Sequence, residues 1–224
     1  MITRRREFLM AGAILGISGV AGAAETPPAA EDVSAVEDLM REHGVLRRIL
    51  LIYEECVRRL QANKGVPANV LLHSTQIIRK FVEDYHEKLE ETYLFPEFEK
   101  HGRLVPLVKV LREQHAAGRA LTDVVFSHVA AAATAPASAA EAAGACTAFL
   151  RMYRPHAARE DTVLFPALRK LLSAKQLDEL GDKFEDEENR RFGADGFGNT
   201  VEKVAAIEKE LGIYDLGQFT PKKA

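Results

Sequence analysis

Two copies of the motif His-x-x-x-Glu are the residues in this sequence best suited to chemistry: His86 with Glu90, and His156 with Glu160. Residues four positions apart lie on the same face of a helix, with Cβ atoms about 5–6 Å apart. A histidine and a glutamate at that spacing can bind one metal ion, or two adjacent ions if the carboxylate bridges them. A single copy would mean little, because such pairs are common on helix surfaces.

The two copies belong to an internal repeat. Residues 86–100 align without gaps to residues 156–170, and seven of fifteen positions are identical, including a Leu-Phe-Pro sequence after each pair. A lone histidine precedes each copy on the helix before it, His43 in one case and His115 in the other. The repeat therefore predicts two helix pairs related by a pseudo-twofold axis, with four histidines and two glutamates facing inward.

Apolar residues recur at steps of three and four along most of the chain, which is typical of amphipathic helices. This spacing predicts helices over 36–60, 68–100 and 104–132, and a fourth helix that carries the second repeat, with Ser138 and Glu141 as its capping box. Pro96, Pro155 and Pro166 each remove a backbone donor and are expected to kink their helices. The predicted fold is an all-α, up-down-up-down four-helix bundle with a C-terminal helical extension.

The chain divides into four predicted regions. Residues 1–24 form a signal peptide, 25–33 a flexible linker, 34–172 the bundle and 173–224 the helical extension. Within the extension, helices are expected over about 173–192, with Ser173 as N-cap and Gly193 as stop, and over 199–212.

The predicted signal peptide combines basic residues, an uncharged apolar stretch over 10–24 and a small-residue cleavage site. Arg5 and Arg6, followed by Phe8 and Leu9, resemble the twin-arginine type. We therefore expect an exported protein, periplasmic or otherwise extracytoplasmic, with no stable membrane insertion after cleavage. An uncleaved N-terminal anchor is the alternative.

Composition narrows the possible functions. The chain has 224 residues, 47% of them hydrophobic, and a net charge of −3. No basic stripe with interleaved aromatic residues is present, so nucleic acid is not an expected partner. There is no nucleotide-binding glycine loop, cysteine cluster or haem-attachment motif. Any catalysis must therefore draw electrons from a donor protein or from the substrate.

Cys56 and Cys146 could form a disulfide in an exported protein, but the sequence leaves this open.

Four imidazoles and two carboxylates form a mixed nitrogen and oxygen ligand set that suits iron or manganese. Structural zinc prefers four ligands, usually with cysteine, so zinc ranks below iron and manganese. The alternative is a purely structural role, in which the histidines bind the carboxylates inside an apolar core. Leaving two carboxylates buried without a cation would be very costly, however.

At these residues the sequence resembles the hemerythrin-like, or HHE cation-binding, domain family over about 34–172. The resemblance rests on His43, His86 with Glu90, His115, and His156 with Glu160, and on the Leu-Phe-Pro that follows each pair. It implies a non-haem centre of two iron ions in which Glu90 and Glu160 bridge the ions and the four histidines are terminal ligands.

The sequence departs from the oxygen-carrying hemerythrins, which have a second histidine four positions after the one matching His115. Arg119 occupies that position here. Those carriers also end their site with an aspartate five positions after the last histidine, whereas here Glu160 lies four positions after His156. The expected function is therefore an exported di-iron protein that binds oxygen, nitric oxide or iron itself. The alternatives are a di-iron oxidoreductase that removes peroxide or nitric oxide, and an iron-centre repair or sensing protein.

Several residues beside the ligands are weaker candidates. Tyr153 and Tyr93 could bond a bound ligand or act in redox chemistry, although most such tyrosines only pack. Glu87 could supply a further carboxylate, whereas Glu42 and Glu113 are expected to be solvated or to support the ligands. His73 and His128 are predicted to lie away from the centre.

Overall fold

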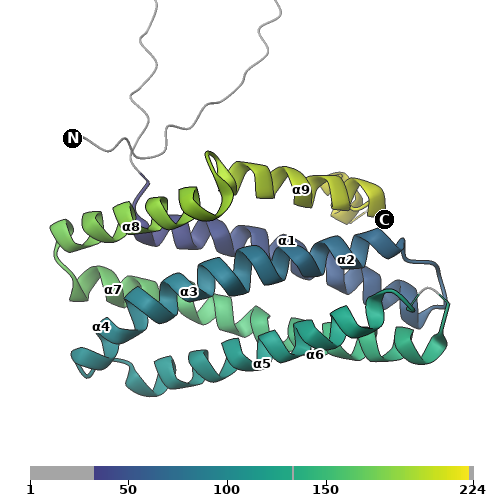
Figure 1. Cartoon of the computed structure of the whole chain (residues 1–224), viewed down its shortest axis with the longest axis horizontal. Helices are drawn as coiled ribbons and strands as arrows, with labels where there is room; N and C mark the ends of the chain where they lie inside the picture. The colour runs from purple at the N-terminus through teal and green to yellow at the C-terminus, as the bar shows by residue number, and fades with distance from the viewer. Residues whose placement is uncertain (1–32, 133, 222–224) are drawn as a thin grey trace, which may run out of the picture.

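The computed structural model describes residues 33–132 and 134–221. The predicted signal peptide, 1–24, and all but the last residue of the predicted linker, 25–33, lie outside the described residues. Within them the protein is an all-helical bundle (Figure 1). No helix in this part of the chain combines the length and apolar character needed to cross a membrane.

Four long helical segments lie along the long axis of the molecule (Figure 1). The first is α1 (Ala35–Gln61) and the third is α5 (Val105–Val129). The second runs without a break through α2 (Ala68–Ile77), η1 (Ile78–His86), α3 (Glu87–Leu89), η2 (Glu90–Leu94) and α4 (Phe95–Lys100). The fourth runs through α6 (Pro136–Arg159), η3 (Glu160–Leu164) and α7 (Phe165–Leu171). Helix α6 packs against both α1 and α5.

The helix ends follow the local sequence in most places. Ser34 caps α1 by accepting a hydrogen bond from the Glu37 amide, and Glu37 complements the positive end of the helix dipole. Helix α4 ends at Lys100, and Gly102 adopts a φ of +62° just beyond it. Glycine commonly takes this left-handed conformation just after the end of a helix.

One sequence prediction about a helix start was wrong. Ser138 and Glu141 do not cap the fourth helix, because α6 already begins at Pro136, whose fixed φ and missing amide suit the first helical position. Helix α5 begins at Val105, close to its predicted start, and Leu104 before it takes a left-handed conformation with φ of 52°.

Three segments, η1, η2 and η3, are π-helical. In η2 the amide of Phe95 donates to the carbonyl of Glu90, and in η3 the amide of Phe165 donates to the carbonyl of Glu160, five residues back in each case. Pro96 and Pro166 follow directly and cannot donate an α-helical bond to the residue four positions earlier. The helices therefore continue past these prolines and widen by π turns, a distortion often found at functional sites.

The C-terminal extension consists of α8 (Ala174–Phe192), α9 (Gly196–Leu211) and a short 3₁₀ helix, η4 (Leu216–Phe219). Ser173 caps α8 in a full capping box with Gln176, and Gly193 ends it, as predicted. Both helices lie along the bundle (Figure 1), where Phe184 and Val204 are buried. A bidentate pair between Arg48 and Glu208 holds α9 against α1.

Cys56 and Cys146 are free thiols in the core, so the possible disulfide between them is not formed. Both are fully buried, in α1 and α6. Burial raises the pKa of the Cys56 thiol to about 12, and it raises the pKa of Cys146 as well. Because the thiolate is the reactive form, both thiols are chemically inert at neutral pH.

Candidate metal centre

Six side chains from all four long segments converge in the middle of the bundle, and none is more than 3% exposed. They are the residues that the repeat selects: His43 from α1, His86 at the end of η1, Glu90 at the start of η2, His115 from α5, His156 from α6 and Glu160 at the start of η3. Both glutamates thus open a π turn. The structure brings together every ligand that the sequence predicts.

The six residues form two groups, each compact enough to hold one cation. One contains His43, His86 and Glu90, the other contains His115, His156 and Glu160, and the candidate ligand atoms within each lie within 4.8 Å of one another.

Each carboxylate also faces the other group. Glu90 lies 3.8 Å from His86 Nε2 and 3.5 Å from His115 Nε2. Glu160 lies 3.1 Å from His156 Nε2 and 3.3 Å from His43 Nε2. Each carboxylate thus faces one histidine of its own group and one of the other group, which is the arrangement that a bridging ligand requires.

The outer nitrogen of every histidine is held by a partner, which leaves the inner nitrogen facing the centre. His43 Nδ1 lies 2.7 Å from Asp161, His86 Nδ1 lies 2.7 Å from Glu42, His115 Nδ1 lies 3.1 Å from Glu91, and His156 Nδ1 lies 2.9 Å from Gln114. An acceptor at Nδ1 fixes the proton there and leaves the Nε2 lone pair free for a metal.

These four partners obey the same pseudo-twofold symmetry as the ligands. Glu42 directly precedes His43 and bonds His86, and Gln114 directly precedes His115 and bonds His156. Glu91 directly follows Glu90 and bonds His115, and Asp161 directly follows Glu160 and bonds His43. Sequence reasoning treated Glu42 only as solvated or supporting, and it missed the other three. The acidic residue that follows the glutamate in both repeat copies was the available signal.

Buried atoms without partners mark the centre itself. Both oxygens of Glu90, both oxygens of Glu160 and Nε2 of His86 are buried and have no hydrogen-bond partner among the described residues. In addition, His115 Nε2 and His156 Nε2 face each other at 3.2 Å. An unpaired buried carboxylate is strongly destabilising, whereas a cation between these atoms would satisfy all of them. The donor set therefore fits a metal centre.

The electrostatics agree with this assignment. Burial raises the pKa of Glu90 well above its usual range, and the negative charge of Glu160 raises it further. Burial lowers the pKa of His115 to about 4, and it lowers the pKa of His86 too. His86 and His115 are therefore neutral at neutral pH, as metal ligation requires, and Glu90 needs a cation beside it to stay ionised. Burial opposes the ionised form of Glu160 too, but the neighbouring His156 and His43 lower its pKa.

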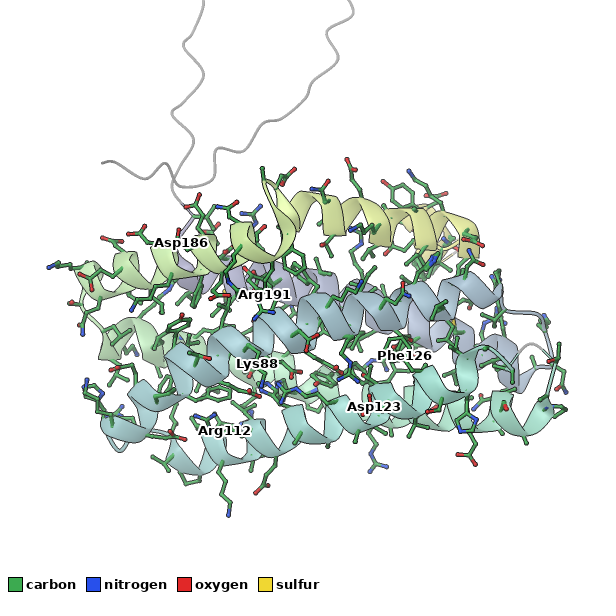
Figure 2. All side chains as sticks on the ribbon, in the orientation of Figure 1. Lys88, Arg112, Asp123, Phe126, Asp186 and Arg191 are labelled. Carbon is green, nitrogen blue, oxygen red and sulfur yellow. The ribbon has the colours of Figure 1, made fainter. Side chains whose placement is uncertain are left out.

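Arg119 occupies the position where oxygen carriers have a further histidine, and it points away from the centre. Its Nη2 binds Oε2 of Glu87 and Oε1 of Glu91, each at 2.7 Å. Glu91 also binds Lys88, labelled in Figure 2. Arg119 thus supports His115 through Glu91 and adds no ligand to the centre.

The two tyrosines considered from the sequence differ in position. Tyr153 is 1% exposed, and its ring centroid lies 5.1 Å from that of His156. Tyr93 is half-buried and packs on Phe184 of α8, with Lys183 over its ring. Tyr153 is therefore next to the candidate centre, and Tyr93 contacts the extension.

Among the other weak candidates, Glu87 lies outside the two ligand groups but forms a third potential cation-binding group with Glu91 and His115. Glu87 is buried and binds Arg119 and Tyr153, and Glu113 is exposed. His73 and His128 belong to no potential metal-binding group in the described part of the chain.

Comparison with known proteins places these residues in a family. A profile of the hemerythrin HHE cation-binding domain matches residues 34–168, a range that contains all six converging side chains. Uncharacterised proteins of Mycobacterium bovis and Mycobacterium tuberculosis are each 56% identical over 197 residues, which is 88% of this chain and 77% of theirs. No solved structure matches the chain. Since the profile covers more than half of the sequence and all of the candidate centre, the protein belongs to the hemerythrin HHE cation-binding domain family.

Proposed function

We propose that this protein holds two iron ions, bridged by Glu90 and Glu160 and bound terminally by His43, His86, His115 and His156. The observation that carries the proposal is the set of buried glutamate oxygens without hydrogen-bond partners, each carboxylate facing histidines of both groups. The mixed nitrogen and oxygen donors favour iron, with manganese and zinc ranked below it.

With its iron ions bound, such a centre would exchange electrons reversibly and would offer a coordination site for a small ligand. We propose that the protein uses it to bind oxygen, nitric oxide or iron itself. The protein's own residues exclude bulk water, since every ligand is buried, and keep each imidazole in the ligating tautomer through its Nδ1 partner.

A second function is a di-iron oxidoreductase that removes peroxide or nitric oxide, or a protein that repairs or senses iron centres. Two observations favour chemistry over simple oxygen carriage. Arg119 replaces a ligand of the carriers, and an oxidisable phenol, Tyr153, lies beside His156. An enzyme of this kind would need an electron-donor protein as partner.

The primary test is the metal content of natively expressed protein by elemental analysis. We expect about two irons per chain, and loss of most of that iron in the double variant His86→Ala, His156→Ala. The matched control is His73→Ala with His128→Ala, which removes two histidines outside the centre. Full iron content in the first double variant would refute the site.

A second measurement separates binder from enzyme. Sustained consumption of hydrogen peroxide or nitric oxide by the iron-loaded protein would identify an enzyme. A reversible spectral change with oxygen or nitric oxide, without turnover, would identify a binder.

We further propose an up-down-up-down order for the four long segments, supported by their short connections, and export by a twin-arginine-type signal in residues 1–24. Cell fractionation of wild type and of Arg5→Lys, Arg6→Lys tests the export. Retention of the variant in the cytoplasm is expected, and equal export of both would contradict the proposal.

A further inference from the structure

A depression in the protein surface lies between α1 and α6, close to the candidate centre. Its volume is about 270 Å³, and it is lined by Arg47, Leu50, Leu51, Tyr153, Arg154 and Ala157. A water molecule occupies about 30 Å³ in the liquid. The depression therefore has room for molecules the size of oxygen, nitric oxide or hydrogen peroxide.

Two ion pairs between α1 and the fourth segment frame this depression. Arg47 pairs with Asp161, and Arg154 pairs with Glu54 at 2.6 Å. The earlier residue of α1 pairs with the later residue of the fourth segment, so the two segments run antiparallel here. Each arginine that lines the depression is matched by a carboxylate, and the depression therefore does not favour anions over neutral molecules.

A single layer of side chains separates the depression from the candidate centre. Leu50, Tyr153 and Ala157 line the depression, yet none is more than 3% exposed, so they form its floor. On the inner side the ring of Tyr153 lies 5.1 Å from that of His156, centroid to centroid, and Ala157 directly follows this histidine. A molecule that passes the floor is therefore next to a proposed iron ligand.

Larger side chains cover the centre toward α4 and α7. The ring of Phe165 stacks on that of His43 at 5.4 Å between centroids. In the same way the ring of Phe95 stacks on that of His115 at 5.5 Å, and both phenylalanines are fully buried. The floor of the depression includes Ala157, whose side chain ends at Cβ, so it is the thinner cover.

The three floor residues differ in how freely they can move. The ring of Tyr153 stacks on Phe149 at 4.2 Å between centroids, and its hydroxyl donates a hydrogen bond to Glu87 at 2.5 Å. Ala157 has no side-chain torsion that could open a gap. Leu50 has two such torsions and no polar atom to anchor it. Rotation of the Leu50 side chain is therefore the smallest motion that opens the floor.

We propose that this depression is the entry route for the small ligand of the iron centre, with Leu50 as its gate. The inference rests on the proposed function, because it requires an iron centre that binds such a ligand. A leucine, an alanine and an aromatic ring form the floor, so the route admits small neutral molecules such as oxygen, nitric oxide and hydrogen peroxide. A metal cation or a charged chelator is excluded, because it would have to lose its water in an apolar passage.

The test is anaerobic stopped-flow absorbance of nitric oxide binding to the reduced, iron-loaded full chain. In Leu50→Ala the gate is shorter, and we expect the association and dissociation rate constants to rise together by roughly tenfold, which corresponds to a barrier about 1.4 kcal/mol lower. Kd should stay unchanged, because the gate contacts the ligand only during passage.

Leu71→Ala is the matched control. Leu71 is 2% exposed, nearly as buried as Leu50, but it does not line the depression and lies 15 residues before His86. The same substitution there should leave both rate constants at their wild-type values.

Leu51→Trp tests the route from the outside. Leu51 lines the depression and is 44% exposed, so a larger side chain can be accommodated there without a change in the core. The indole should narrow the mouth and lower both rate constants by roughly threefold, a small rise of the barrier. This variant decides the question even if Leu50→Ala, a core substitution, loses iron.

The iron content of each sample, measured in parallel, separates this inference from the proposed function. Wild-type rate constants in the iron-loaded variants of Leu50 and Leu51 would overturn the entry route alone. A change in the dissociation rate constant alone, with an altered Kd, would do the same, because it reports contact with the bound ligand. Iron-loaded wild type that binds no nitric oxide would overturn the ligand-binding function, and wild type that binds no iron would overturn the proposed centre.

Discussion

Around the candidate centre, four polar side chains determine how the histidines face. Asp161, Glu42, Glu91 and Gln114 each accept from an Nδ1, and all four bonds cross between different long segments. Partners of this kind set the tautomer, the ring orientation and the basicity of a ligating imidazole. The proposed iron affinity therefore depends on residues that never touch the metal.

Asp161 offers a clear test at this scale. Asp161→Ala removes the acceptor of His43, and we expect iron affinity to fall about 10–100-fold, the usual cost of losing such a partner. Competition with a chelator of known affinity measures the change. The control is Asp186→Ala, an exposed aspartate of α8 labelled in Figure 2. Equal losses in both variants would mean that Asp161 has no specific role.

The ligands could be predicted from the sequence, whereas most of their partners could not. His86 and Glu90 share a helix face, so their spacing alone reveals them, and the repeat extends the argument to the other copy. The bond from His43 to Asp161 joins residues 118 positions apart, and its one sign in the sequence is the acidic residue that follows the glutamate in both repeat copies. Gln114 is a neutral amide, so its residue type gave no reason to predict that it supports a metal ligand.

At the scale of the helical element, π turns place the two carboxylates that we propose to bridge the ions. Glu90 and Glu160 are the first residues of η2 and η3, and each turn is followed by phenylalanine and proline. Hydrophobic periodicity predicted the extent of the second segment, 68–100, because a π turn hardly disturbs a pattern read over many residues. The missing proline donors predicted a local distortion, but the sequence pattern did not show that it takes the form of a π turn.

Pro166→Ala tests whether the proline maintains the wide turn. The new amide can donate to the carbonyl four residues back, which favours a regular α-helix and rotates Glu160 relative to the histidines. We expect the fold to persist and iron affinity to fall roughly tenfold, within the range for perturbed ligand orientation. Pro106→Ala is the control, because Pro106 lies in the first turn of α5, where no donor is needed. Iron affinity that stays unchanged in Pro166→Ala would contradict this role.

At the scale of the whole molecule, the unpaired carboxylates should make stability depend on metal. Without a cation, the buried Glu90 carboxylate opposes folding, because burial and the charge of Glu160 both disfavour its ionised form. Metal at 100 times its dissociation constant adds about 2.7 kcal/mol of stability. For a chain of this size each kcal/mol raises Tm by about 2–4 °C, so we expect an increase of roughly 5–10 °C.

Thermal unfolding followed by circular dichroism, with and without added iron, measures this increase. A chelator should reverse it, and the double variant His86→Ala, His156→Ala should show no shift. A wild-type Tm that is equal with iron and with chelator would support the purely structural role for these side chains.

The outer partners of the histidines follow the pseudo-twofold axis in position but not in charge. Asp161 and Glu42 give the group of His43 and His86 two anionic neighbours, whereas the group of His115 and His156 has one anion, Glu91, and the neutral Gln114. Negative charge at Nδ1 makes an imidazole a stronger electron donor. The duplicated sequence thus gives the candidate centre unequal halves, and we expect the two proposed iron ions to be oxidised one after the other.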